Sequence, residues 1–118
     1  MKLRVLKYSL LLVLALFASS TFLFAQSLLH NTGTTIHISS GSSLFVDGNT
    51  NLLGDSILKN NGEFTSTGNI ISSTFKSISG NGKVRLVGKA DQYISGDSLL
   101  SFSILEADKD SGVLYLLT

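Results

Sequence analysis

The chain has 118 residues, of which 43% are hydrophobic and 14% are charged, and it contains neither cysteine nor proline. This length is enough for one domain, and the lack of cysteine excludes a disulfide scaffold, a thiolate zinc site and a cysteine nucleophile. The formal net charge of +1 includes Lys2, Arg4 and Lys7, and without these three residues the remaining chain carries −2, which argues against a nucleic-acid or anionic-membrane partner.

The N-terminus has the pattern of a secretory signal peptide. Residues 1–7 are basic, residues 8–18 are apolar, and a short polar step at residues 19–21 precedes an apolar segment that ends in Ala25. We predict cleavage after Ala25, so that residues 1–25 are the signal peptide and residues 26–118 the mature chain, without a membrane span. An uncleaved anchor is the alternative, because residues 8–25 are just long enough to cross a bilayer. With cleavage after Ala25, the sequence predicts a protein that is secreted or displayed on the outer cell surface.

Residues 26–118 have an all-β pattern. Serine, glycine, threonine and asparagine make up 42 of these 93 residues. Apolar residues recur at every second position, as at Ile36 and Ile38, Leu44 and Val46, and Val84 and Leu86. This alternation indicates strands, and the clusters of Gly, Asn and Ser between them indicate turns.

Three segments that begin and end in glycine recur at a nearly constant spacing: 41–48 (GSSLFVDG), 62–68 (GEFTSTG) and 82–88 (GKVRLVG). A further short strand precedes each segment, near residues 36–38, 57–58 and 77–79. Two strands per repeat of about 20 residues predict a β-solenoid of three to four short coils, a right-handed parallel β-helix. Gly96 and Gly112 break the spacing, which indicates an insertion in the third coil or the next one. A β-sandwich is the alternative fold.

Stacking of the coils predicts rows of inward side chains. One row is Leu44 or Val46, Phe64, and Val84 or Leu86, and another is Ile38, Ile57 or Leu58, and Ile78. The expected outward neighbours are Ser43, Asp47, Glu63, Thr65, Lys83 and Arg85. Phe45 and Tyr93 remain open, since either side chain can face the core or the solvent.

Several short motifs resemble a known class of proteins. They lie at residues 41–44 (GSSL), 60–64 (NNGEF), 67–70 (TGNI), 78–84 (ISGNGKV), 92–96 (QYISG), 102–106 (FSILE) and 111–114 (SGVL). Together they resemble the repetitive β-helix regions of large secreted bacterial surface proteins of the adhesin-like type. The resemblance implies a non-enzymatic surface module, with no catalytic residues to transfer.

The C-terminal segment, residues 113–118 (VLYLLT), is an apolar strand without a polar cap. An uncapped apolar edge invites aggregation. We therefore expect residues 26–118 to be an incomplete solenoid, the N-terminal part of a larger secreted protein, with downstream coils of the same chain.

Three groups of residues superficially resemble cation sites. His30 and His37 lack a third ligand at metal spacing, so we interpret them as surface histidines. Residues 47–51 (DGNTN) lack the ligand pattern of a calcium loop, and we interpret them as a turn. Glu106, Asp108 and Asp110 are interpreted as a solvated loop. The sequence predicts no metal site and no cofactor.

A secreted β-helix polysaccharide lyase or hydrolase, or a fragment of one, is the alternative function, by analogy of fold. The candidate carboxylates Asp91 and Asp97 lie in expected turns, and the one basic cluster comprises Lys83, Arg85 and Lys89. Neither arrangement meets the requirements of an active site. The sequence therefore predicts a non-enzymatic structural or adhesive module without catalytic residues. Its expected partners are extracellular polysaccharide or protein surfaces, held by many weak hydrogen bonds.

Overall fold

The computed structural model describes residues 2–18, 27–73, 78–96 and 101–117. The elements of these ranges are α1 (Lys2–Ala18), β1 (Ser27–Asn31), β2 (Thr35–Ile38), β3 (Ser43–Val46), β4 (Gly48–Leu52), β5 (Ile57–Asn60), β6 (Glu63–Ser66), β7 (Ile70–Ser72), β8 (Ile78–Ser79), β9 (Lys83–Gly88), β10 (Gln92–Gly96), β11 (Ile104–Lys109) and β12 (Leu114–Leu117). Ala25 and the expected cleavage site lie outside the described residues. Within the described ranges, no helix combines the length and the apolar character that a membrane span requires.

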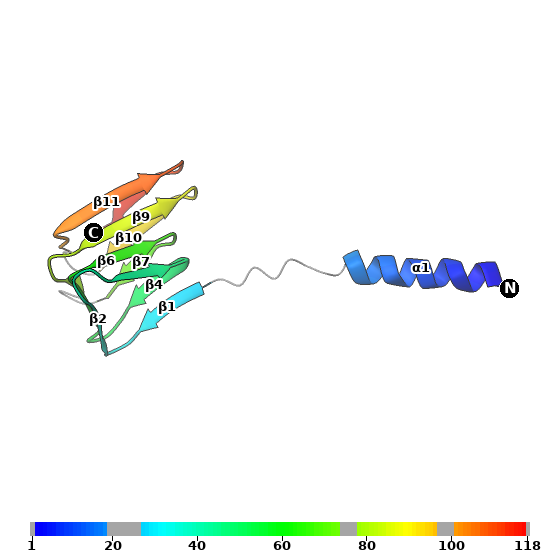
Figure 1. The fold of residues 1–118 in the computed structure, drawn as a ribbon, viewed down its shortest axis with the longest axis horizontal. Helices are drawn as coiled ribbons and strands as arrows, with labels where there is room; N and C mark the ends of the chain where they lie inside the picture. The colour runs from blue at the N-terminus through cyan, green and yellow to red at the C-terminus, as the bar shows by residue number, and fades with distance from the viewer. Residues whose placement is uncertain (1, 19–26, 74–77, 97–100, 118) are drawn as a thin grey trace.

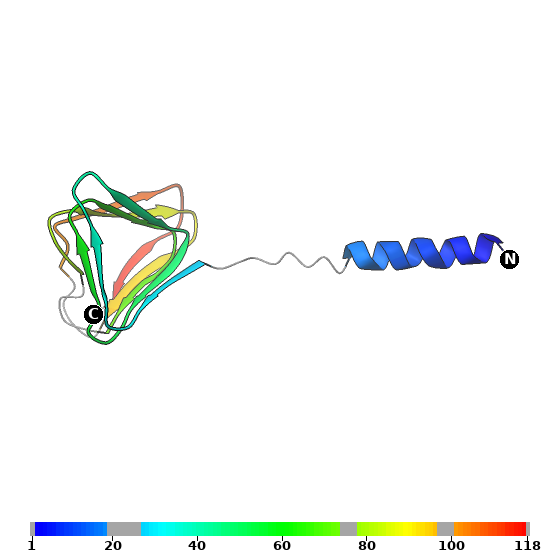
Figure 2. The same cartoon turned by 60° about the horizontal axis from the view of Figure 1, so that its bottom comes forward.

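The strands form a β-solenoid of about four coils. Each strand pairs in parallel with its counterpart one coil away, which gives a five-stranded sheet (β1-β4-β7-β10-β12), a four-stranded sheet (β3-β6-β9-β11) and a three-stranded sheet (β2-β5-β8). Figure 1 shows the coils stacked on one another, and Figure 2 shows the three sheets as the walls of a triangular prism. The predicted solenoid is confirmed, and the β-sandwich is excluded because every pairing in the described strands is parallel.

The prediction of two strands per coil is wrong, because each of the first three coils has three strands. The additional strand belongs to the five-stranded sheet, and in the second coil it is β4, within the DGNTN segment interpreted above as a turn. Asp47 does lie at a corner, but Gly48–Leu52 pairs with both β1 and β7. Backbone hydrogen bonds on both sides hold this polar segment extended, so it needs no apolar alternation.

The insertion lies at the corner between β9 and β10. Glu63 at the start of β6 pairs with Lys83, whereas Ile70 at the start of β7 pairs with Ile94, which is a wider step along the chain. The coil is therefore of ordinary length up to the start of β9 and is lengthened at the turn that follows Gly88.

The core is built from the rows of inward side chains. In the four-stranded sheet the row is Leu44, Phe64, Val84 and Leu105, which confirms the predicted row and extends it. In the three-stranded sheet Ile36, not Ile38, stacks with Leu58 and Ile78. Ile38 is buried one inward position further along, beside Asn60. The prediction placed Ile38 in this row instead of Ile36, the preceding inward residue of the same strand. Hydrophobic alternation shows which face of a strand is buried, but it does not show the register between coils.

Candidate functional site

A shallow groove of about 540 Å³ follows the corner between the three-stranded and the four-stranded sheets. Its lining residues come from three successive coils and from β11: Gly41, Ser42, Ser43, Asn61, Gly62, Glu63, Asn81, Gly82, Lys83 and Ile104. Equivalent residues of successive coils lie side by side because Ser43, Glu63 and Lys83 are in register. The groove therefore runs along the solenoid axis, across the strands, and repeats its chemistry at each coil.

The floor of the groove consists of glycine backbone. A Cβ atom on Gly62 would lie 2.1 Å from the carbonyl oxygen of Ser42, and one on Gly82 would lie 2.4 Å from the carbonyl oxygen of Gly62. Such distances are far below van der Waals contact. Only glycine therefore fits this corner in the second and third coils without displacing the backbone of the preceding coil.

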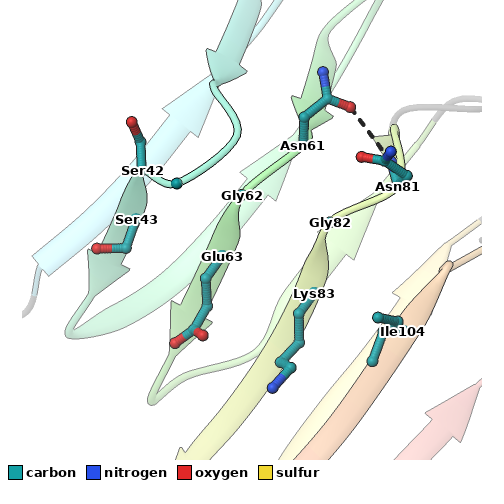
Figure 3. A pocket seen from close by; sticks show the side chains of 10 residues that line it. Ser42, Ser43, Asn61, Gly62, Glu63, Asn81, Gly82, Lys83 and Ile104 are labelled. Carbon is teal, nitrogen blue, oxygen red and sulfur yellow. Dashed lines mark hydrogen bonds between the residues drawn. The ribbon is translucent and has the colours of Figure 1, made fainter.

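One wall consists of asparagine amides. The backbone N–H of Asn81 donates to Oδ1 of Asn61 at 3.4 Å, as Figure 3 shows. Nδ2 of Asn61 lies 3.4 Å from Nε2 of His37 on β2. Asn81 is exposed and Asn61 is half-buried. This wall therefore presents amide groups that can both donate and accept hydrogen bonds.

The opposite wall carries Ser43, Glu63 and Lys83, with Ile104 beyond them on β11 (Figure 3). The Thr65 hydroxyl donates to Oε1 of Glu63 at 3.2 Å and so orients the carboxylate. Nζ of Lys83 forms an ion pair with Oε2 of Glu106 at 2.8 Å. One carboxylate and one ammonium line the groove, so its formal charge is zero.

Two residues of the predicted basic cluster, Lys83 and Arg85, belong to an ion-pair network on the outer face of the four-stranded sheet. Lys83 pairs with Glu106, and Arg85 pairs with both Glu106 and Asp108. The hydrogen bond and the charge of Glu106 raise the pKa of Lys83 above its usual value, and those of Asp108 raise the pKa of Arg85. The carboxylates of Glu106 and Asp108 therefore lie on β11 and neutralise two cations, while Asp110 is exposed just beyond that strand. Their interpretation as a solvated loop was wrong for Glu106 and Asp108.

This network predicts a pH dependence of stability. Because the folded-state pKa of Lys83 is raised, its contribution to the free energy of unfolding is complete below the unfolded-state value of 10.5. The contribution disappears as the pH rises through the folded-state pKa. We expect Lys83→Met to destabilise the protein at about pH 8 and to have a smaller effect at about pH 11, as measured by chemical denaturation. An equal effect at both pH values would contradict this account.

The remaining cation candidates are not brought together. His30 lies on β1 in the five-stranded sheet and His37 on β2 in the three-stranded sheet, and both are exposed. The part of the chain that the structure describes contains no group of three His, Asp or Glu residues suited to a metal ion.

The candidate carboxylate Asp91 has a structural partner. Its Oδ1 accepts a hydrogen bond from the backbone N–H of Val113 at 2.8 Å, which ties the turn after β9 to the start of β12. Asp97 lies outside the described residues. Lys89 is exposed in the same turn as Asp91, and its carbonyl accepts a hydrogen bond from the Ser111 hydroxyl at 3.0 Å.

The two aromatic residues left open by the sequence both face outward. Phe45 is 60% exposed on β3, and Tyr93 is 37% exposed on β10. The ring of Tyr93 stacks on that of Tyr115, with centroids 4.9 Å apart and planes inclined by 12°. The sequence did not single out Tyr115, because the irregular spacing of the last coil concealed its register with Tyr93.

Sequence reasoning did not identify the groove residues Ser42, Asn61 and Asn81 as a site. The signal was present in the Asn-Gly pairs at residues 61–62 and 81–82, which lie one coil apart.

Comparison with known proteins finds no family model that matches the chain, and no curated protein or solved structure that is significantly similar to it.

Proposed function

We propose that the protein is an exported, non-enzymatic structural and adhesive module that binds an extended, uncharged polysaccharide in its corner groove. The observation that carries this proposal is the groove itself, which crosses successive coils and repeats small polar residues at each one. The N-terminal leader pattern supports export, and the motifs that resemble adhesin-like β-helix regions support a role on the outer surface.

The dimensions of the groove suit a linear polymer. Successive coils are about 4.8 Å apart, the spacing of hydrogen-bonded strands. A chain lying along the axis therefore passes Ser42, Asn61 and Asn81 in turn. Each contact is weak, but a polymer that engages several at once gains affinity from their number. The stiffness of the parallel sheets keeps the groups in line before the ligand arrives.

The chemistry of the walls favours an uncharged polyol. Amides and hydroxyls donate and accept hydrogen bonds, as sugar hydroxyls do. The charges of Glu63 and Lys83 cancel, and Glu106 already neutralises the ammonium of Lys83. A polyanion would gain no net attraction along this path and would meet the carboxylate of Glu63. An uncharged polymer meets neither repulsion nor a large desolvation cost.

The test is binding of the purified protein to immobilised neutral glucans, xylans and mannans, with a polyuronate as the anionic comparison. The double variant Asn61→Ala/Asn81→Ala removes one wall, and we expect it to weaken binding to a neutral glycan by about tenfold. Asn49→Ala is the matched control, since Asn49 also accepts a backbone N–H from the next coil, at 2.9 Å, but lies outside the groove. Asn49→Ala should leave binding unchanged.

Three results would contradict the proposal. These are no binding to any neutral glycan, stronger binding to the polyuronate, or equal loss in the groove variant and the Asn49→Ala control. Substrate turnover that disappears on replacement of Asp91 or Lys83 would contradict the non-enzymatic role.

A further inference from the structure

The outer face of the five-stranded sheet lacks charged side chains. Its strands β1, β4, β7, β10 and β12 contain no Asp, Glu, Lys or Arg, although they form the largest sheet. The four-stranded sheet, in contrast, carries Glu63, Lys83, Arg85, Glu106 and Asp108 on its outer side. An exposed sheet face without charges is unusual on a soluble domain, where the outward positions of strands are normally polar or charged.

Apolar side chains gather on this face. The apolar patch consists of Leu28, Ile71, Tyr93, Tyr115 and Leu117, which are 37–56% exposed. Ile71 and Leu117 both pair with Ser95, and Tyr93 pairs with Tyr115, so four of the five lie on neighbouring strands β7, β10 and β12. The stacked tyrosine rings are already ordered against each other. Binding through them therefore costs little side-chain entropy.

We infer that this face is an interface between two copies of the chain, related by a twofold axis. A twofold contact places the same surface against itself. Surfaces with carboxylates or ammonium groups repel their own copies, but the groups here are apolar, or are amides, hydroxyls and the imidazole of His30, all of which can donate and accept hydrogen bonds. Asn49, Tyr93 and Tyr115 can each pair with their own kind. The face is therefore complementary to itself and has no feature that selects a charged partner.

The size of the face sets the strength of the dimer. Five strands with four spacings of about 4.8 Å and a width of five residues give a wall of about 19 by 16 Å. The area of this wall is well below the about 800 Å² of surface that each partner buries in a stable complex. We therefore expect the described strands to form a weak, transient dimer. This inference does not depend on the proposed binding of polysaccharide, because the groove lies at the opposite corner, between the other two sheets.

The test is analytical ultracentrifugation of the full chain from about 1 to about 500 µM. Ile71→Lys places a charge on the neutral face, and we expect it to weaken dimerisation at least tenfold, because two buried like charges would then oppose each other. Ile57→Lys is the matched control, because Ile57 is also outward and, like Ile71, 39% exposed, but lies on β5 in the three-stranded sheet. Circular dichroism verifies that both variants retain the fold.

The expected result is a concentration-dependent dimer for the native chain and for Ile57→Lys, and a monomer for Ile71→Lys. A monomer at every concentration would overturn the inference, as would equal weakening by the two variants. Association that persists unchanged in Ile71→Lys would also overturn it, and would place the contact elsewhere, for example on the exposed leucines of α1.

Discussion

Replacing Phe64 by alanine is expected to lower the free energy of unfolding by about 3–5 kcal/mol, the usual cost of removing a buried phenylalanine ring. Phe64 is completely buried in the second coil, between Leu44 of the first coil and Val84 of the third. Strands pinned by backbone hydrogen bonds on both sides cannot close in on the cavity. Since domains of this size are stable by about 5–15 kcal/mol, Phe64→Ala removes a large part of the total. Thermal unfolding should show a fall in Tm of more than about 12 °C.

Phe45→Ala is the matched control for this prediction. Phe45 pairs with Thr65, the residue after Phe64, but it faces outward and is 60% exposed. Its loss should change stability by no more than about 0.5 kcal/mol. Similar effects of the two substitutions would mean that the inward and outward faces of β3 and β6 are not as described.

The glycine spacing of the sequence predicted the stacked coils because glycine marks a physical constraint. At residues 41–48, 62–68 and 82–88 the chain turns a tight corner, crosses one face and turns again. A Cβ atom on Gly62, Gly68 or Gly82 would collide with the backbone of the preceding coil, and Gly41, Gly48 and Gly88 adopt positive φ values of 80–150°. Other residues enter that region only with strain. Corners that recur at a constant spacing produce equal coils, and equal coils stack.

The additional strand β4 of the second coil could not be read from hydrophobic alternation. In β4, the inward positions are taken by Thr50 and Leu52 and the outward ones by Asn49 and Asn51, so the pattern is mostly polar. Thr50 is nevertheless completely buried, in the same row as Ile70. Position within the stack, rather than the local pattern, determines which residues of a solenoid are internal.

Buried polar residues at the corners were missed for the same reason. Asn60 is 2% exposed, and it donates to the carbonyl of Lys83 at 2.8 Å and accepts from the backbone N–H of Gly62 at 3.1 Å. Gln92 is fully buried, and its Nε2 donates to the carbonyls of Ser66 and Gly68. These side chains satisfy backbone groups where the chain leaves a sheet. A single sequence does not show which amides form these hydrogen bonds, because the carbonyls of Lys83, Ser66 and Gly68 lie a whole coil away along the chain.

The groove depends on the same long-range register. Ser42, Asn61 and Asn81 each belong to a Gly-containing turn, and separately each suits an ordinary turn. The three turns form one surface only because they are aligned across successive coils. The ion pairs of Lys83 and Arg85 also arise in this way, since their partners lie on β11 in the next coil. In this fold the repeat can be predicted from sequence, whereas the site requires the register.

Gly62→Ala is expected to destabilise the protein by about 3 kcal/mol, at the upper end of the cost of overpacking. The new Cβ atom would lie 2.1 Å from the Ser42 carbonyl oxygen and 2.5 Å from that of Ser39. Both are backbone atoms of the preceding coil, so no side chain can rotate away. Relief requires the corner to open, which would break the hydrogen bond from Glu63 N–H to the Ser42 carbonyl, 3.0 Å long. Chemical denaturation measures the loss, and the groove should lose its glycan affinity with it.

Gly54→Ala separates this steric effect from the general cost of replacing glycine. Gly54 has a φ of +60°, and a Cβ atom there would lie 3.5 Å from its nearest neighbour, the Thr32 carbonyl oxygen. Its replacement therefore meets backbone strain of about 1–2 kcal/mol but no collision. A larger loss for Gly62→Ala than for Gly54→Ala locates the constraint in the contact between coils. The reverse order would show that successive coils do not approach as closely at this corner as the glycine floor of the groove requires.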